Sequence, residues 1–274
     1  MIATIKAEWR KNRLRPGFLI SAGVLAAIIV VAYGVSWYLA FHPARGDRFP
    51  VSIAILYPDQ FVNFIMGAGY PLGAAIAIVL GGVFAGSEYS WGTMKTMFTQ
   101  GPGRLTTSGG RVVIFAALMA IMTLVMFVVG AASSAVIALF QGHSITAWPA
   151  PFDLAKGLGA VWLVFAVNGS IGIALGILLR NSAAALGIGL TYVLAVEFLA
   201  VRFIDTINNG AYHWIGNLFA GQNSTALLQY FTSPAFSPSG SPAIGAEQTV
   251  LVLLAYFAGL VVVAAGAMRL RDVT

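Results

Sequence analysis

Few residues of this chain are suited to catalysis, and those few do not come together in a known pattern. The sequence has no cysteine, and its three histidines lie far apart at His42, His143 and His213. It has neither a His-Glu-x-x-His motif nor a lysine directly after a glycine, so a phosphate-binding loop is absent from it. The stretch from Asn168 to Gly172 comes near a serine nucleophile elbow but lacks its first glycine. The sequence therefore predicts no catalytic residue, no metal site and no cofactor bound by this chain, which is not an enzyme on this interpretation.

Two polar side chains interrupt otherwise apolar stretches. Asn168 and Glu197 each lie within a long run of hydrophobic residues. Polar groups inside a membrane span are expensive and are candidates for a transport pathway. The alternative for Glu197 is an ion pair at a helix end with the nearby Arg202. One carboxylate and one amide are too few for a proton relay, so we predict at most a contribution to a substrate pathway.

The composition places these residues in a membrane. Hydrophobic residues make up 59% of the 274 residues and charged residues only 9%, against about 25% charged in a soluble domain. A net charge of +6 in such a chain indicates loops held on the cytoplasmic side rather than a nucleic-acid partner.

Six apolar segments are long enough to cross a bilayer as helices, which takes about 20 residues each. They do not alternate apolar and polar residues as strands of a membrane barrel do. We therefore predict an all-α polytopic membrane protein that forms a single transmembrane domain over residues 1–274. The predicted spans are 17–41, 64–86, 112–140, 157–179, 183–201 and 249–267.

The distribution of cations predicts the orientation. With the N-terminus inside, eleven Lys and Arg residues fall on the cytoplasmic side and four outside. This bias favours cytoplasmic N- and C-termini. The first apolar run is too long for a cleaved signal peptide, so we expect it to be a retained anchor.

The segment before the first span has an amphipathic pattern. Ile2, Ile5 and Trp9 follow helical spacing, and Lys6, Arg10 and Arg13 form a neighbouring basic stripe. This pattern predicts an interfacial helix that rests on membrane lipid, ending at Pro16-Gly17. A solvated basic tail is the alternative. The predicted anchor residues are Ile5, Trp9, Arg10 and Arg13.

A second amphipathic segment follows the second predicted span. Trp91, Met94 and Phe98 share one helical face, and Gly101-Pro102-Gly103 ends the segment. Glu88 lies near its start, where a carboxylate suits the helix dipole. We predict a short helix along the cytoplasmic surface that docks a partner, the alternative being a loop helix resting on lipid.

The segment 202–248 between the last two spans is long and rich in aromatic residues, with Gly221 near its middle. It predicts two short half-helices that turn back into the outer leaflet, followed by a surface loop over 233–242. A folded external cap is the alternative. The pairs Gly82/Gly86 and Gly172/Gly176, each spaced by four, could allow close helix packing.

The loop after the second span resembles the cytoplasmic loop of type-2 ABC exporter permeases. Glu88, Gly92, Thr93, Lys95 and Arg104 match that family's pattern in order, although arginine is frequent where Lys95 stands. The family also has an N-terminal interfacial helix, six spans, a coupling helix between spans two and three, and a re-entrant hairpin before span six. The resemblance implies that coupling to an ATP-binding subunit involves Glu88, Trp91, Gly92, Thr93, Met94, Lys95, Phe98 and Arg104.

The resemblance also implies partners and a location. Two permease chains, identical or not, would pair, and each would dock a separate subunit that binds ATP and Mg. The complex would export a substrate across the bacterial plasma membrane, and an apolar pathway favours an amphipathic or lipid-like one. The competing hypothesis is a secondary transporter or channel without an ATPase, which needs a coupling-ion site at the membrane midplane.

Overall fold

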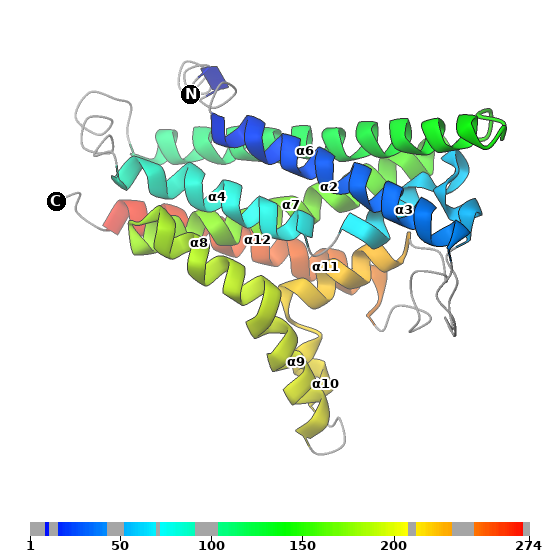
Figure 1. Ribbon diagram of the computed structural model, residues 1–274. Helices are drawn as coiled ribbons and strands as arrows, with labels where there is room; N and C mark the ends of the chain where they lie inside the picture. The colour runs from blue at the N-terminus through cyan, green and yellow to red at the C-terminus, as the bar shows by residue number, and fades with distance from the viewer. Residues whose placement is uncertain are drawn as a thin grey trace.

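Every regular element that the structure describes is a helix. The computed structural model describes residues 9–10, 16–42, 52–69, 72–90, 104–207, 212–231 and 244–270. Its longer helices run roughly side by side as a bundle (Figure 1). They are α2 (Pro16–Phe41), α3 (Phe61–Gly69), α4 (Leu72–Ser90), α6 (Arg104–Phe140), α7 (Pro151–Leu179), α8 (Ser182–Thr191), α9 (Glu197–Thr206), α11 (Ala220–Gln229) and α12 (Ala246–Leu270).

Shorter turns connect these helices. Two 3-10 turns, η1 (Ile53–Leu56) and η2 (Pro58–Gln60), lead into α3, and α10 (His213–Gly216) precedes α11. A π-helical turn, η3 (Tyr192–Val196), joins α8 to α9. Five continuous helical stretches are long and apolar enough to cross a membrane: Pro16–Phe41, Gly109–Phe140, Pro151–Leu179, Ser182–Thr206 and Ala246–Met268. The prediction of an all-α polytopic membrane protein is confirmed.

The second predicted span is not one continuous helix. The structure has two helical stretches there, Pro58–Ala68 and Leu72–Ser87, which meet at an angle of 62°. Counted together they give a sixth span. Pro71 follows the first stretch in the sequence, and a proline disfavours helical conformation in the residue before it. The span predicted over 64–86 is therefore present as two helical stretches, a break that average hydropathy does not register.

Other helix limits also differ from those predicted. α6 begins at Arg104 rather than near 112. α9 continues to Thr206, and α12 begins at Ala246, so the predicted external segment 202–248 is helical at both ends. α2 and the start of α8 fall within one residue of prediction, and α7 ends at Leu179 as predicted but starts at Pro151, six residues early. A proline suits the first turn of a helix, which explains the early start.

Helices α4 and α7 form the centre of the bundle and approach each other closely. A Cβ atom added to Gly172 of α7 would lie 2.8 Å from the backbone nitrogen of Gly82 in α4. One added to Gly176 would lie 3.0 Å from the nitrogen of Gly86. Only glycine permits such backbone contact, so the close packing predicted for the two Gly-x-x-x-Gly pairs is confirmed.

A short turn reverses the chain between α7 and α8. Arg180 adopts a left-handed conformation with φ of 53°. The side chain of Asn181 then accepts hydrogen bonds from the backbone nitrogens of Ala183 and Ala184, at 2.9 and 3.2 Å. This cap starts α8 and directs it back along α4.

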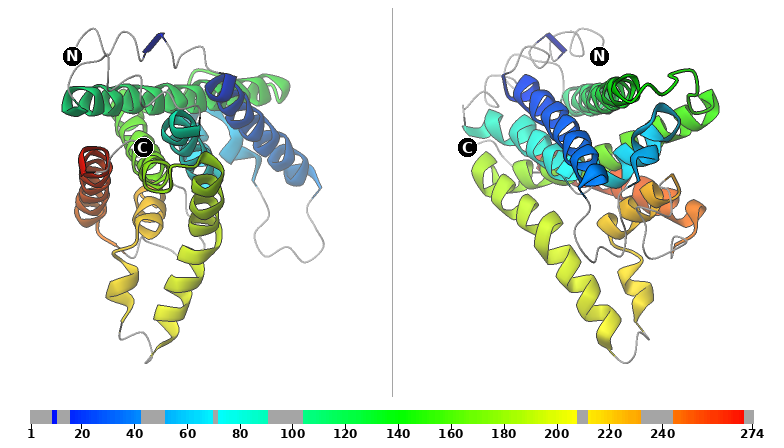
Figure 2. Two further views of the ribbon diagram at one scale, coloured as in Figure 1. Left: turned by 90° about the vertical axis from the view of Figure 1, so that its left-hand side faces the viewer. Right: turned by 45° about the vertical axis from the view of Figure 1, so that its right-hand side comes forward.

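The span formed by α8, η3 and α9 leaves the bundle as it proceeds. α8 starts beside α4, and α9 with α10 then projects sideways, as both views in Figure 2 show. Helix α11 returns to the bundle and packs against α3, α7 and α12. The two short helices predicted for this segment are thus present as α10 and α11. The predicted loop over 233–242 lies outside the described residues.

Candidate functional site

The predicted coupling residues fall mostly outside the described part of the chain. Trp91, Gly92, Thr93, Met94, Lys95 and Phe98 belong to the segment 91–103, which the structure does not describe. Glu88 lies in the last turn of α4, and Arg104 opens α6. The ends of α4 and α12 and the starts of α2, α6 and α8 lie at the same end of the bundle (Figure 1). The loop that carries the predicted coupling residues therefore begins and finishes at that end.

Only a small part of the predicted interfacial anchor is described. Trp9 packs against the main hydrophobic core, whereas the neighbouring Arg10 is exposed. Ile5 and Arg13 lie outside the described residues. Trp9 therefore contacts the bundle, and the interfacial helix as a whole stays a prediction.

Arg111 is a buried cation that the charge pattern of the sequence presents only as a topological signal. It is 5% exposed, lies on α6 and contacts residues of α4 and α12. Its guanidinium carbon lies 5.7 Å from the centre of the Phe84 ring, and its Nη1 lies 4.0 Å from the Met268 sulfur. Because α6 starts at Arg104, Arg111 lies within this helix. It connects α4, α6 and α12 near the end of the bundle where the loop between α4 and α6 begins.

Glu197 is the buried carboxylate of the described residues, with 5% of its surface exposed. Its Oε1 accepts hydrogen bonds from the backbone nitrogens of Gly221 and Gln222, the latter at 3.3 Å. The Tyr192 side chain also hydrogen-bonds to it. The carboxylate therefore caps the N-terminus of α11 from a different span, where a negative charge complements the helix dipole.

Glycine at position 221 makes this approach possible. A Cβ atom there would lie 2.7 Å from both carboxylate oxygens of Glu197. Next to it, the Asn223 amide donates to the carbonyls of Asn217 and Phe219, both at 2.8 Å. We call the group formed by Glu197, Tyr192, Gly221, Gln222 and Asn223 the α11 junction.

The ion pair expected between Glu197 and Arg202 is wrong for the residues that the structure describes. The guanidinium of Arg202 lies 5.5 Å from the centre of the Phe198 ring instead. Five residues along a helix place two side chains on different faces, so Glu197 points inward while Arg202 is exposed. One feature of the sequence could have indicated the true partner of Glu197. The N-cap residue of α11 is Phe219, which offers no side-chain acceptor to the helix. A helix that starts in this way needs an acceptor from elsewhere.

Asn168, the second predicted pathway residue, lies in the packed centre of the bundle. It is 1% exposed, and its amide donates to the Val164 carbonyl of its own helix at 2.9 Å. The structure does not bring Asn168 and Glu197 into one site, since neither lines the two larger cavities. Both cavities lie along α2 and α6, one near each end of α2, and their walls are almost wholly apolar.

Within the described ranges, no group of three or more His, Asp or Glu side chains is placed to hold a metal ion. The polar groups that are buried instead hold helices together, as the α11 junction and Arg111 do.

Comparison with known proteins identifies the family. The chain matches the family described as ABC-2 family transporter protein over residues 4–196. This match includes the N-terminal segment, the loop from Glu88 to Arg104, and most of the first five spans. No curated protein matches the chain. Because the family match covers most of the sequence and the structure is that of a polytopic helical membrane protein, the chain belongs to the ABC-2 family of transporter proteins.

Proposed function

We propose that this chain is the permease subunit of an ATP-driven exporter in the bacterial plasma membrane. The observation that carries the proposal is the ABC-2 family match, which runs through the whole loop from Glu88 to Arg104. The chain has no phosphate-binding loop of its own. ATP and Mg would therefore be bound by a separate subunit, and this chain would have no enzymatic activity by itself.

The loop between α4 and α6 would dock that subunit. Its apolar residues Trp91, Met94 and Phe98 would anchor a coupling helix, and Lys95 and Arg104 would offer charge to the partner surface. α4 ends and α6 begins at the same end of the bundle. This end would be the cytoplasmic one, and both termini would lie on that side. A second permease chain, identical or not, would complete the pathway.

The cargo we propose is amphipathic or lipid-like. The lining of the larger cavities is apolar, with few polar atoms from Ser21, Ser87, Ser133 and Gln141. Such walls suit hydrocarbon better than a hydrated ion. Uptake of labelled phospholipid, an amphipathic drug and Na⁺ by inside-out vesicles would compare the classes, and saturable transport of Na⁺ alone would contradict this choice.

Gentle purification of the tagged chain from its own membranes tests the proposal. We expect a protein with a phosphate-binding loop to co-purify and to hydrolyse ATP, and Trp91→Ala or Gly92→Asp to uncouple hydrolysis from transport while the chain still inserts. Gly23→Ala serves as the control, because no atom lies within 4 Å of the added methyl group. Transport by the purified chain in the absence of any ATPase would favour the alternative of a secondary transporter or channel.

A further inference from the structure

The larger of the two apolar cavities lies between the C-terminal halves of α2 and α6, and we call it the Gly34 cavity. Its volume is about 700 Å³, within the range of about 300–1,000 Å³ found for ligand pockets. Residues 30–37 of α2 and 128–141 at the end of α6 carry its walls, and the structure describes all of them. Most of these side chains are apolar, so the cavity suits a ligand that consists mainly of hydrocarbon.

Small residues line the Gly34 cavity from both helices, yet the helices do not close on each other. Gly34 of α2 and Ala132 of α6 are both part of its wall. Such residues usually let two backbones touch, as the glycines of α4 and α7 do. A Cβ atom added to Gly34 would instead have no heavy atom within 4 Å. The neighbouring Tyr33 packs its ring against Phe64 of α3, with 4.2 Å between ring centres, so α3 supports α2 while the space beside α6 stays open.

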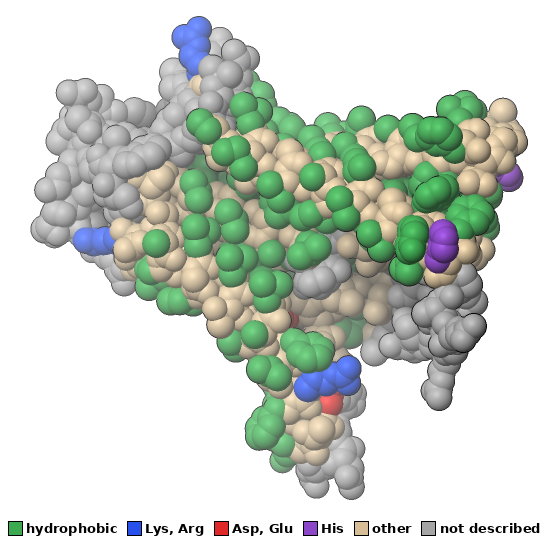
Figure 3. Space-filling model, in the orientation of Figure 1, with side chains coloured by type: hydrophobic (Ala, Val, Ile, Leu, Met, Phe, Trp, Pro, Cys, Tyr) green, Lys and Arg blue, Asp and Glu red, His purple; other side chains and the backbone are tan. Residues whose placement is uncertain are grey.

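The Gly34 cavity is continuous with the surface that faces the membrane. Val128 and Phe140 both line the cavity and are 65% and 81% exposed. Figure 3 shows hydrophobic side chains spread along the flank formed by α2 and α6. An empty apolar cavity forfeits dispersion contacts along its whole lining. In a bilayer, the molecule that meets this opening is a neighbouring lipid.

Aromatic side chains at one end of the Gly34 cavity mark the level of the lipid headgroups. Trp37 lines the cavity, and the adjacent Tyr38 and the more distant Trp148 are exposed at the same end of the bundle. Trp and Tyr concentrate at the boundary between membrane and water. Gln141, which also lines this end, is exposed and carries an amide that suits an ester or phosphate oxygen.

The depth of the Gly34 cavity corresponds to about one leaflet. At 1.5 Å per residue, its lining runs about 10 Å along α2, from Trp37 back to Val30. Along α6 it runs about 20 Å, from Gln141 back to Val128. Half of the hydrocarbon core of a bilayer is about 15 Å thick. An acyl chain whose headgroup lies level with Trp37 therefore extends along the whole cavity.

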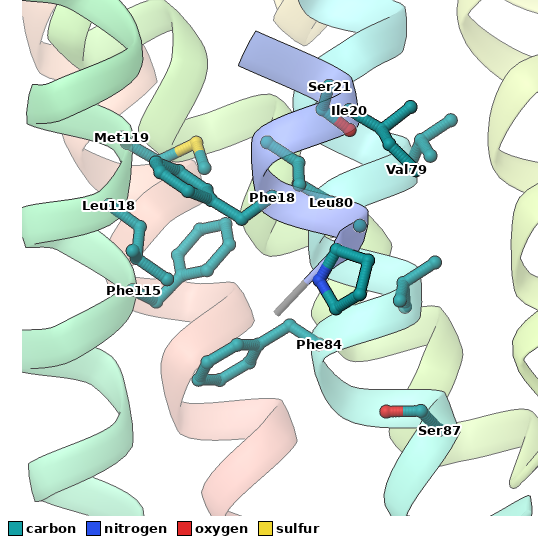
Figure 4. Close-up of a pocket in the computed structure, with 13 residues that line it drawn as sticks. Phe18, Ile20, Ser21, Val79, Leu80, Phe84, Ser87, Phe115, Leu118 and Met119 are labelled. Atoms are coloured by element: carbon teal, nitrogen blue, oxygen red, sulfur yellow. The ribbon is translucent and has the colours of Figure 1, made fainter. Parts of the chain in front are cut away.

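The cavity near the start of α2 differs in both of these features. Figure 4 shows Phe18, Phe84 and Phe115 around it, and its volume is about 480 Å³. None of its 13 described lining residues is Trp or Tyr. Its glycine, Gly17, is also not open, because an added Cβ would be in ordinary contact with Val83 at 3.9 Å. Interfacial aromatic residues and an open glycine thus occur together at the Gly34 cavity.

We propose that the Gly34 cavity binds one acyl chain of a membrane phospholipid, whose headgroup lies level with Trp37. The lipid comes from the leaflet at the end of the bundle opposite the loop between α4 and α6 (Figure 1). This site depends on the membrane-protein fold and not on ATP-driven export, because only α2, α6 and the residue after α6 form it. The bound chain fills the space between the C-terminal halves of α2 and α6.

Photolabelling of the full chain in detergent tests the proposal. The probe is phosphatidylcholine that carries a diazirine in one acyl chain, either next to the ester or at the tip, and mass spectrometry locates the labelled residues. We expect labelling of the cavity to saturate at one lipid per chain and to be displaced by unlabelled phosphatidylcholine. The probe next to the ester should label Trp37 and Phe140, and the probe at the tip should label Val30 and Val128.

Gly34→Phe should reduce labelling of the cavity about tenfold, because a ring in this open position displaces about two methylene groups of the acyl chain. Gly23→Phe is the matched control. Gly23 lies on the same face of α2, about three turns earlier. It has no heavy atom within 4 Å of an added Cβ and lines neither cavity, so its variant should be labelled like the unaltered chain.

Several results would overturn the proposal. Labelling that never saturates and reaches the exposed Leu124 and Leu139 of α6 equally would indicate boundary lipid only. Unchanged labelling of Gly34→Phe would place the lipid elsewhere. Labelling that appears only after a dimer of the chain dissociates would assign the cavity to a second copy. The two probe positions test the unaltered chain without any variant, and a reversed order of labelled residues would contradict a headgroup level with Trp37.

Discussion

The central pair, α4 with α7, and the outer span, α8 with η3 and α9, are built on opposite principles. Of the most apolar 18 residues in each span, 72% are buried in α7 and 28% in the outer span. The central pair excludes side chains from its contact, so that glycine backbones touch. The outer span instead presents Phe198, Leu199 and Phe203 outward, each more than half exposed.

This difference shows where each part of the molecule gains its stability. In a membrane, exposing an apolar side chain to lipid costs little, so association between spans depends on close packing and buried polar contacts. The central pair associates by close packing. The outer span also uses a buried polar contact, because Glu197 fastens it to α11 at the point where it leaves the bundle. The central pair is therefore held by shape, and the outer span, once it has left its contact with α4, is held by a polar junction.

Breaking the central pair should have the largest effect. Gly172→Ala would place a methyl group against the Ile78 carbonyl and 2.8 Å from the Gly82 nitrogen, so two backbones must separate. We expect the free energy of unfolding to fall by about 3 kcal/mol, at the upper end for overpacking. Thermal unfolding in detergent, followed by fluorescence-detected size-exclusion, measures the loss.

Gly159→Ala is the control for this substitution. Gly159 lies in the same helix, α7, and no heavy atom falls within 4 Å of the added methyl group. Its unfolding free energy should change by no more than about 0.5 kcal/mol. Equal melting temperatures for the two variants would show that α4 and α7 are not in backbone contact.

Breaking the α11 junction should have the second-largest effect on the free energy of unfolding. Glu197→Ala leaves the buried nitrogens of Gly221 and Gln222 without this acceptor, which costs about 2 kcal/mol. Glu197→Gln keeps a carbonyl acceptor and should lose about half as much, because the charge contribution to the helix dipole disappears. Hydrogen exchange at the two amides, measured alongside unfolding, locates the effect; unchanged exchange in the alanine variant would contradict the junction.

The close contact of the central pair and the existence of the outer span could be predicted from sequence, whereas the junction that holds the outer span to α11 could not. Long apolar runs indicate spans because about 20 residues must cross the bilayer, and glycines four apart indicate close contact. These signals are local and repeat along one helix. The break between α3 and α4 was missed because a hydropathy average spreads over Pro71.

The α11 junction was out of reach because it depends on residues far apart in the chain. Glu197 and Gly221 are 24 residues apart, and they meet because α11 returns to the bundle and packs against α3, α7 and α12. The nearest cation in sequence, Arg202, was the wrong partner. Arg111 was missed for a related reason: a charge count assigns it to a loop, while the helix that buries it starts seven residues earlier.

Gly221→Ala should have a smaller effect than loss of the carboxylate. The added methyl group would lie 2.7 Å from the Glu197 carboxylate, but that group ends a flexible side chain and can shift. We expect a loss of about 1 kcal/mol, most of it from the weakened hydrogen bonds. A double-mutant cycle with Glu197→Ala checks this origin: the two losses should not add, and full additivity would separate Gly221 from the junction.

The smallest predicted effect lies in the outer span and has the opposite sign. A methyl group added to Gly187 in α8 would have no heavy atom within 4 Å, whereas one added to Gly189, two residues later, would lie 2.6 Å from Ile78. Gly187→Ala should therefore raise the unfolding free energy by about 0.5 kcal/mol, because alanine loses less backbone entropy in a helix. Gly189→Ala should lower it, since the face toward α4 has no room. If unfolding measurements gave both variants the same sign, the outer span would not have one packed and one free face, and its contrast with the central pair would disappear.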